Sequence, residues 1–166
     1  KVARPRAVKF LGMCIKGGRL QIAPKSMKRA ADKVRELVPR RTHIPLEQQI
    51  ATINQWYRGW SGYFCLTEQP SQLDYIEAHI RRRLRALFVK QKKRRRNLCE
   101  YLRKRGITAS VARKTAYSHK SWWALSHTWA VHQVWNNTWF RHHGLYTISD
   151  EKRPPWKPLW YGWVYA

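Results

Sequence analysis

The side chains that usually carry catalysis are few in this sequence and far apart. Its 166 residues include only nine carboxylates. No two of them stand in a D-x-D, D-D or E-x-x-H arrangement, and the adjacent pair Asp150-Glu151 lies in an expected surface turn without partners for acid–base chemistry. No G-x-x-x-x-G-K-[ST] phosphate loop occurs. The sequence therefore gives little support for an enzyme active site in this chain.

Cysteines and histidines do not form a metal-ligand pattern either. Cys14, Cys65 and Cys99 are widely separated, and His142-His143 has no further ligand nearby, so we predict no metal site. An odd number of scattered cysteines predicts free thiols in a reducing compartment. No apolar run reaches the roughly 18 residues of a membrane span. We therefore expect no membrane partner and a cytoplasmic location, in a bacterial or organellar interior.

Positive charge is the chemical feature that this sequence has in excess. The formal net charge is +25, and it is unevenly distributed. Residues 78–120 hold 16 basic side chains against one acidic, whereas residues 42–77 hold one basic side chain against four acidic ones. Such segregation predicts a surface that binds a polyanion, with nucleic acid as the leading candidate and an anionic membrane surface as the second.

The densest charge lies in residues 80–97, IRRRLRALFVKQKKRRRN. Ten of these 18 residues are Lys or Arg and none is acidic. Leu84 and Leu87 continue an apolar stripe through the run, so packing would fix where the charge points. A solvated charged face is the alternative, and the apolar stripe and the lack of compensating acids disfavour it. We expect phosphate contacts from residues 90–96, on a helix that extends beyond its packed part.

A hairpin and helices must position this charge. Residues 8–24 predict a β-hairpin that turns at Gly17-Gly18 and ends at Pro24. A helix should follow from an N-cap at Ser26 to about Val38. A second helix is expected over residues 46–64, where two glycines would kink its last turns or let another element approach closely.

The third helix should begin at Ser71 and run without a break to a C-cap at Gly106. Shorter helices are expected after Thr108 and after Ser121. Eight of the ten tryptophans follow residue 120, and they could form a packed core or a base-stacking platform, of which the helix-like spacing favours the core. The expected fold class is mostly α: a bundle of about three long helices, preceded by a β-hairpin and followed by shorter helices.

Four motifs in order resemble one known family. VKFLGMCI followed by IAP resembles the closing motif of the polymerase palm in group II intron reverse transcriptases. INQWYRGWSGYF resembles the hallmark of their maturase-specific region, also called domain X or the thumb. LDYIEAHIRRRLRALFVKQKKRRR is similar to the long basic helix of that thumb, and VWNNTWFRHHGLYTISD is similar to the family's closing motif. Together the motifs cover about residues 8–150.

The resemblance implies a division of the chain and a function. Residues 1–24 would end the palm, residues 25–106 would form the thumb, residues 107–150 a helical extension, and residues 151–166 a Trp/Pro-rich tail. The expected partners are group II intron RNA, an RNA–DNA duplex, and the palm and fingers in cis or in trans, with target DNA as a further candidate. In this family the region helps the intron fold into its splicing-active form and serves the mobility of the element.

The resemblance and the charge pattern give the expected RNA-binding residues. They are Arg81, Arg82, Arg83, Arg85, Lys90, Gln91, Lys92, Lys93, Arg94, Arg95, Arg96, Lys25, Lys28, Arg29, Arg113, Lys114 and Lys120. The matches to the family's core motif are Trp56, Arg58, Gly59, Trp60 and Phe64. Of these, Trp60 and Phe64 are expected to pack, while Arg58 could pack or contact RNA.

One departure from the family limits the expected activity. The family's catalytic Tyr-x-Asp-Asp signature does not occur in this sequence, so we expect no catalytic residues and no cofactor in this chain. Mg²⁺ is expected only for a bound ribozyme and for a polymerase domain elsewhere. The chain would then be the C-terminal piece of a longer or split protein. A fragment of an active RNA-directed DNA polymerase and a generic basic ribonucleoprotein scaffold remain the alternatives.

Overall fold

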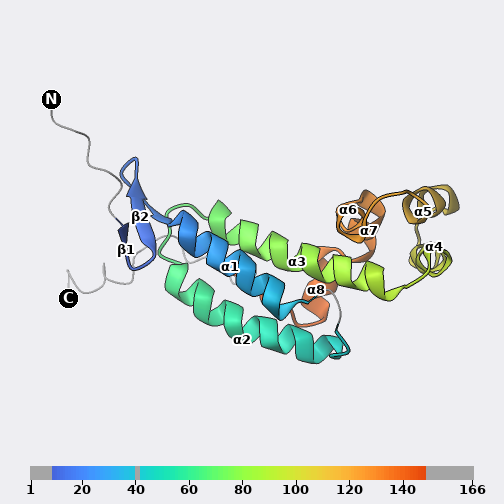
Figure 1. Ribbon diagram of the computed structural model, residues 1–166, viewed down its shortest axis with the longest axis horizontal. Helices are drawn as coiled ribbons and strands as arrows, with labels where there is room; N and C mark the ends of the chain where they lie inside the picture. Colours follow the sequence, from blue (N-terminus) through green and yellow to red (C-terminus); the bar gives the residue numbers. More distant parts are fainter. Residues whose placement is uncertain (1–8, 40–41, 149–166) are drawn as a thin grey trace.

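The computed structural model describes residues 9–39 and 42–148, and helices dominate them (Figure 1). Three long helices lie side by side: α1 (Pro24–Leu37), α2 (Leu46–Phe64) and α3 (Ser71–Gln91). The shorter helices that follow are α4 (Arg95–Lys104), α5 (Ala109–Ala116), α6 (Trp122–Leu125), α7 (Trp129–Val134) and α8 (Asn137–His142). The predicted mostly-α fold class is confirmed.

A small antiparallel sheet precedes the helices. Its order is β1 (Lys9–Phe10), β2 (Met13–Lys16) and β3 (Arg19–Ile22). The predicted hairpin is β2–β3, and both residues of its turn, Gly17 and Gly18, have positive φ angles of 59° and 73°, as a two-residue hairpin turn requires. The short strand β1 is an addition that the sequence did not suggest.

The first helix begins earlier than predicted. Pro24 occupies its first turn, where a fixed φ and a missing N–H are both tolerated. Ser26 is therefore not the N-cap, and that prediction was wrong. Its Oγ instead donates a hydrogen bond of 2.9 Å to the carbonyl oxygen of Gly12. This bond ties the turn between β1 and β2 to the start of α1.

The third predicted helix is two helices, which corrects the prediction of one unbroken element. α3 ends at Gln91, Lys93 adopts a left-handed φ of 57°, and α4 starts at Arg95 in a new direction (Figure 1). The fold-back lets Leu98 and Leu102 become fully buried. In a straight helix these two leucines would leave the end of the bundle for solvent, and the loss of apolar burial would be large.

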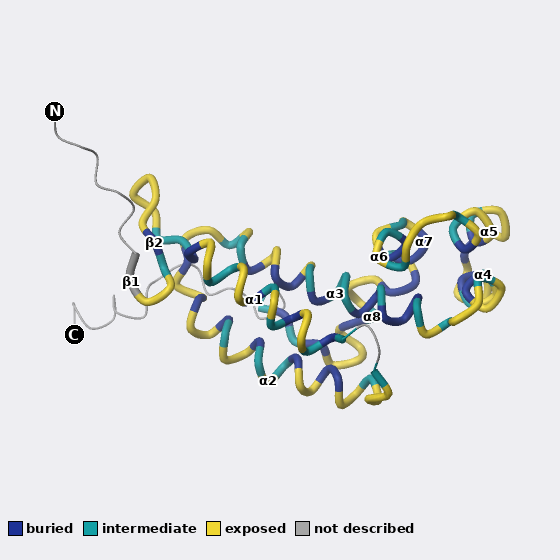
Figure 2. Tube along the Cα trace, in the orientation of Figure 1, coloured by how far each residue is buried: buried dark blue, intermediate teal, exposed yellow. Residues whose placement is uncertain are grey.

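Most of the elements share one hydrophobic core. Its buried residues run from Ala30 in α1 to Leu145 after α8, and Figure 2 shows the buried stripe inside each long helix. Trp135 is 2% exposed and stacks on Tyr101 with 5.3 Å between ring centroids. The C-terminal helices therefore complete the core of the bundle, and the Trp-rich segment supplies much of it. This core continues across residue 106, and the division of the chain there stays a prediction.

Candidate RNA-binding surface

The arginines of α3 make many contacts with the protein itself. Arg81 forms a salt bridge of 3.4 Å with the buried carboxylate of Glu77. Arg83 donates from Nη2 to the carbonyl oxygens of Val38 at 2.6 Å and Arg35 at 3.3 Å. A cation at these carbonyls suits the negative end of the α1 dipole. Arg83 thus holds the end of α1 against α3, whereas the Arg81 bridge lies within α3. The involvement of both arginines in RNA binding stays a prediction.

Arg85 lies deepest of the predicted RNA-binding residues. It is 5% exposed, its Nε donates to the carbonyl oxygen of Trp135, and its guanidinium lies over the Phe140 ring at 5.4 Å. Burial, with a smaller contribution from the charge of Arg81, lowers the pKa of Arg85 to about 10. Its place in the R-x-R-x-R pattern gave no sign of this, because Arg85 shares the buried side of α3 with Leu84 and Phe88.

Arg82 faces a different surface, next to the C-terminal helices. Its guanidinium lies 4.1 Å from the centroid of the Trp123 ring, a cation–π distance. His79, one turn earlier, meets the same indole edge-on at 5.9 Å. Burial lowers the pKa of His79, and the nearby charges of Arg83, Arg35 and Arg82 lower it further. Burial first, and this group of cations second, thus favour the neutral form of the imidazole.

The basic residues at the turn between α3 and α4 are of two kinds: some contact the protein itself and others are exposed. Nζ of Lys92 lies 3.6 Å from the centroid of the Tyr101 ring. Burial is the main cause that lowers the pKa of Lys92, and the charge of Arg105 lowers it further. Arg95 is half-buried and donates from Nη1 to the carbonyl oxygens of Ala116 and Ser118. Lys93 and Arg94, by contrast, are exposed at the tip.

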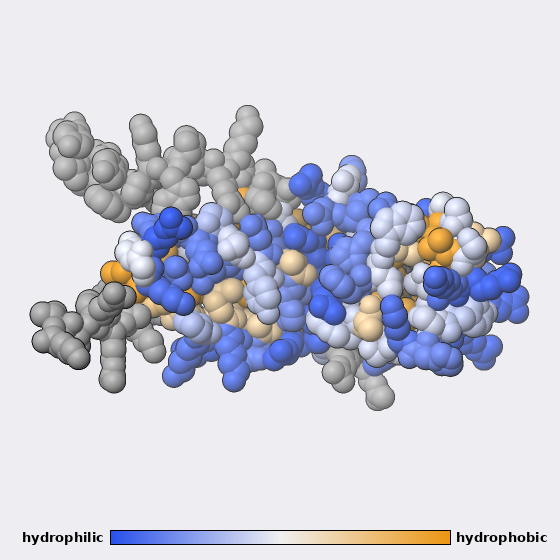
Figure 3. All heavy atoms as spheres, turned by 90° about the horizontal axis from the view of Figure 1, so that it is seen from above, coloured by the Kyte–Doolittle hydropathy of each residue, from blue (hydrophilic) through white to orange (hydrophobic). Residues whose placement is uncertain are grey.

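Exposed cations also cover the two helices beyond that turn. Together with the tip they form what we call the α4–α5 basic surface: Lys93, Arg94, Arg96, Arg103, Lys104, Arg105, Arg113, Lys114 and Lys120. Figure 3 shows hydrophilic side chains gathered at this end of the molecule. Glu100, the acidic residue of this segment, pairs with Arg96 at 2.9 Å, and that bond lowers the pKa of Glu100. Residues 103–105 are not among the predicted RNA-binding residues, although the run R-K-R before Gly106 is the signal that indicates them.

The first helix carries charge of both signs. Lys25, Lys28 and Arg29 are exposed, as a binding role would need. Further along α1, Lys33 pairs with Glu36 at 2.6 Å and Arg35 with Asp32 at 2.5 Å. The exposed face of α1 is therefore less purely positive than the α4–α5 basic surface.

The α2 motif that resembles the family's core motif contributes aromatic side chains to the interior of the bundle. Trp60 contacts Phe64 with ring centroids 4.9 Å apart, and Phe64 is 8% exposed. Trp56 stacks on Trp60 at 6.0 Å. Arg58 is exposed, and its guanidinium lies 4.9 Å from the Tyr146 ring. Within the described residues nothing lies within 4 Å of a Cβ placed at Gly59, and α2 continues through it, so the expected kink or close approach is absent there.

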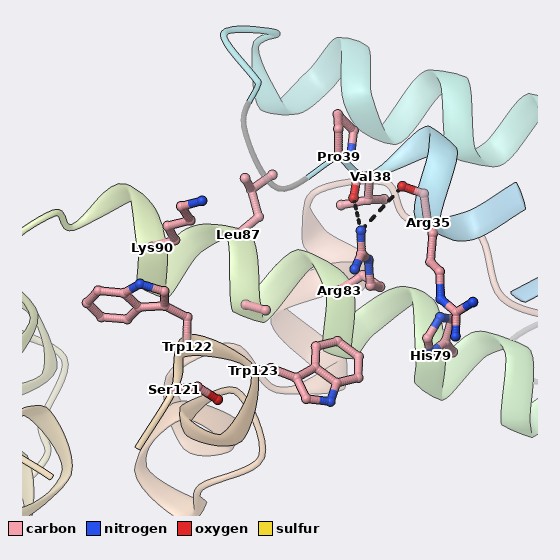
Figure 4. Close-up of a pocket in the computed structure, with 11 residues that line it drawn as sticks. Arg35, Val38, Pro39, His79, Arg83, Leu87, Lys90, Ser121, Trp122 and Trp123 are labelled. Atoms are coloured by element: carbon pink, nitrogen blue, oxygen red, sulfur yellow. Dashed lines mark hydrogen bonds between the residues drawn. The ribbon is translucent and has the colours of Figure 1, made fainter. Parts of the chain in front are cut away.

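A pocket of about 480 Å³ opens where α1, α3 and α6 meet (Figure 4). Arg35, His79, Arg83 and Lys90 line it together with Trp122 and Trp123. Predicted residues Arg83 and Lys90 thus come together here with aromatic side chains from a segment 30 or more residues away. The sequence could not place them together, because nothing in it fixes where α6 packs.

The described residues contain no group of three His, Cys, Asp or Glu side chains that could hold a metal ion. None of the described helices is both long and apolar enough to cross a membrane.

A comparison with known protein families agrees with the second and third of the four motifs, which lie in α2 and α3. A search of curated proteins found no match. A protein-family model described as "Group II intron, maturase-specific domain" matches residues 27–106, which contain most of α1 and all of α2, α3 and α4. Residues 27–106 of this chain therefore match the family of group II intron maturase-specific domains, the same region that the motifs of α2 and α3 indicate.

Proposed function

We propose that this chain binds group II intron RNA through the α4–α5 basic surface and thereby stabilises the splicing-active form of the intron. One observation carries the proposal. Nine exposed cations lie on α4, α5 and the segments next to them, and residues 78–120 hold one acidic residue, Glu100, which is already paired with Arg96. The cations of such a surface repel one another and weaken the folded state. Binding of a polyanion neutralises them and removes this repulsion.

Packing beneath the cations makes the surface a preorganised one. Leu98 and Leu102 of α4 are fully buried, as are Ala112 and Ala116 of α5. The helix backbones are therefore fixed, and binding has to order only the outer side chains. A rigid array of cations suits the phosphates and wide minor groove of A-form RNA, which proteins recognise mainly by shape. Intron RNA would thus be recognised by its fold more than by its base sequence.

Joined to a polymerase domain, in cis or in trans, the same surface would grip the RNA–DNA duplex of template and primer. Such a duplex has a related geometry and the same phosphate charge. Target DNA would be a further ligand during mobility of the intron. Mg²⁺ would act in the ribozyme and in the polymerase domain. The chain would meet these partners in the cytoplasm of a bacterium or in the interior of an organelle.

The proposal is tested by binding to a folded group II intron at several salt concentrations. Arg103→Glu with Arg113→Glu should weaken binding at least tenfold and flatten the log–log salt slope by about 0.7–0.9 per lost contact. Lys16→Glu with Arg19→Glu, two exposed changes on the β-hairpin, serve as the control and should have a smaller effect. Equal loss from both sets would mean that only net charge matters.

Competition distinguishes the specific function from a generic one. At moderate salt a folded group II intron should displace labelled intron far better than bulk tRNA does. If tRNA competes equally well, the chain is a generic basic scaffold. The alternative of a polymerase fragment is tested separately, by primer extension after adding a palm and fingers domain of the same family.

A further inference from the structure

The pocket between α1, α3 and α6 combines two kinds of lining. Arg35 and Lys90 bring positive charge, and none of its lining residues is acidic. Trp122 and Trp123 bring two indoles from α6, and Val38, Pro39 and Leu87 form an apolar side. Figure 4 shows Trp122 near Lys90, and Trp123 between Trp122 and Arg83. Charge and flat apolar surface together suit a ligand that has both a phosphate and an aromatic ring.

The two tryptophans differ in how far they are already engaged. Arg82 covers the Trp123 ring at 4.1 Å and His79 meets it edge-on, so this indole is oriented by its neighbours. Trp122 is half-buried and has no ring or cation partner among the described residues. A nucleobase has a π face that stacks on such a ring whatever its sequence. Trp122 is therefore the better candidate for stacking.

The polar side of the pocket is fixed by the protein fold. Arg83 is held by the carbonyl oxygens of Val38 and Arg35, which keeps the end of α1 against α3. The Arg35 side chain is 59% exposed, and its exposed ion pair with Asp32 is of the weak kind. Nε2 of His79 is buried and has no hydrogen-bond partner among the described residues.

We infer that this pocket receives one unpaired nucleotide of the bound RNA, with its base against Trp122 and its phosphate near Lys90. The inference rests on the proposed function and adds a second, different contact to it. The volume of about 480 Å³ lies in the range of small-ligand pockets. A base inside a continuous duplex cannot enter, because it stays stacked between its neighbours, whereas a bulged base is already available.

The test compares two RNA hairpins that differ by one bulged nucleotide. The full 166-residue chain should bind the bulged hairpin more tightly than the perfectly paired one, by about tenfold given the size of base–aromatic stacking. With 2-aminopurine at the bulge, binding should also quench the fluorescence of that base. 2-Aminopurine in the paired stem should change little.

Substitutions in the pocket test whether it causes the preference for the bulged hairpin. Trp122→Leu should remove the preference and the quenching while leaving affinity for the paired hairpin within about twofold. Trp122→Phe, which keeps a ring, should retain part of both. Trp129→Leu is the matched control, because Trp129 is 63% exposed and does not line the pocket. Lys90→Gln, which needs no change in the aromatic packing, should lower the affinity for the bulged hairpin more than for the paired one.

The outcomes separate the two proposals. Equal affinity for both hairpins, or a preference that survives Trp122→Leu and Lys90→Gln, would overturn the pocket and leave the α4–α5 basic surface standing. Failure to bind either hairpin or the folded intron would overturn the proposed function and the pocket with it. If Trp122→Leu does not fold, as circular dichroism would show, Trp122→Phe and Lys90→Gln decide the question.

Discussion

Arg85 donates a hydrogen bond through Nε to the carbonyl oxygen of Trp135 at 2.8 Å, and both residues are buried. Trp135 is the C-cap of α7, so this bond satisfies a carbonyl group at a helix end and joins α3 to the C-terminal helices. One arginine of a run that looks entirely like an RNA ligand is thus part of the core.

Replacing Arg85 by Met should therefore destabilise the protein. The change leaves the Trp135 carbonyl oxygen without its donor in a buried place, and the expected loss is about 1–3 kcal/mol in the free energy of unfolding. Urea denaturation followed by circular dichroism would measure it. The control Arg103→Met lies on an exposed position of α4 and should change stability by less than about 0.5 kcal/mol. Equal effects would show that the buried bond contributes nothing.

Periodicity in the sequence was enough to predict the long helices but not the direction of every side chain. The apolar stripe through Ile80, Leu84 and Leu87 identified α3 and its buried face. The break after Gln91 was missed because no Gly or Pro marks it, and Lys93 takes the left-handed conformation instead. That conformation depends on the burial of Leu98 and Leu102 against α5, a tertiary effect that no local pattern contains.

The sequence was enough to predict where the positive charge is concentrated, but not which cations are bound by groups of the protein itself. The run at residues 90–96 correctly marked a region with exposed cations, Lys93 and Arg94 among them. Which cations are taken up by the protein depends on carbonyl groups that come from distant segments, such as those of Val38 and Trp135. Unsatisfied carbonyls at helix ends exist only once the fold is formed, so sequence reasoning could not assign them.

Arg94 and Arg95 are neighbours that should behave differently. Arg94 is exposed, so Arg94→Glu should weaken RNA binding and leave the free energy of unfolding within about 0.5 kcal/mol of its original value. Arg95 donates to the carbonyl oxygens of Ala116 and Ser118, so Arg95→Glu should cost about 1–3 kcal/mol of stability. Thermal melts and RNA titrations of the two single variants would separate the effects.

The pair also corrects a simpler expectation. From the sequence alone, changing Arg94 and Arg95 together to Glu should weaken RNA binding without loss of melting temperature. With Arg95 holding the end of α5, the double variant should lose both. A double variant that melts like the parent would mean that the bonds from Arg95 are replaced by water without cost.

Two glycines offer opposite effects on stability from the same substitution. Gly59 lies in the interior of α2 with no described atom within 4 Å of a Cβ, so Gly59→Ala should stabilise the protein by about 0.5–1 kcal/mol. Gly12 has a φ of 81°, and a Cβ there would lie 2.8 Å from Ser26 Oγ. Gly12→Ala should therefore destabilise it by about 1–2 kcal/mol. Chemical denaturation of both variants checks the signs, and a loss from Gly59→Ala would reveal a close approach at this face of α2.

Acid should weaken the fold through two histidines. Burial is the main cause that lowers the pKa of both His79 and His132, and nearby arginines add to it. Arg83, Arg35 and Arg82 surround His79, while Arg85, Arg82 and Arg81 act on His132 together with His127. Each imidazole therefore stays neutral in the folded chain at a pH where the unfolded chain, with an ordinary pKa of 6.5, already binds a proton.

The sign of the pH dependence follows from proton uptake. As pH falls through 6.5, the unfolded state binds more protons than the folded state, so the free energy of unfolding decreases. We expect urea denaturation to show this decrease between about pH 7.5 and 5.5, a range above the ordinary pKa values of carboxylates. His79→Gln with His132→Gln should flatten the dependence, whereas His43→Gln, at an exposed position, should leave it unchanged. An equally steep dependence in the double variant would exclude these two histidines as its source.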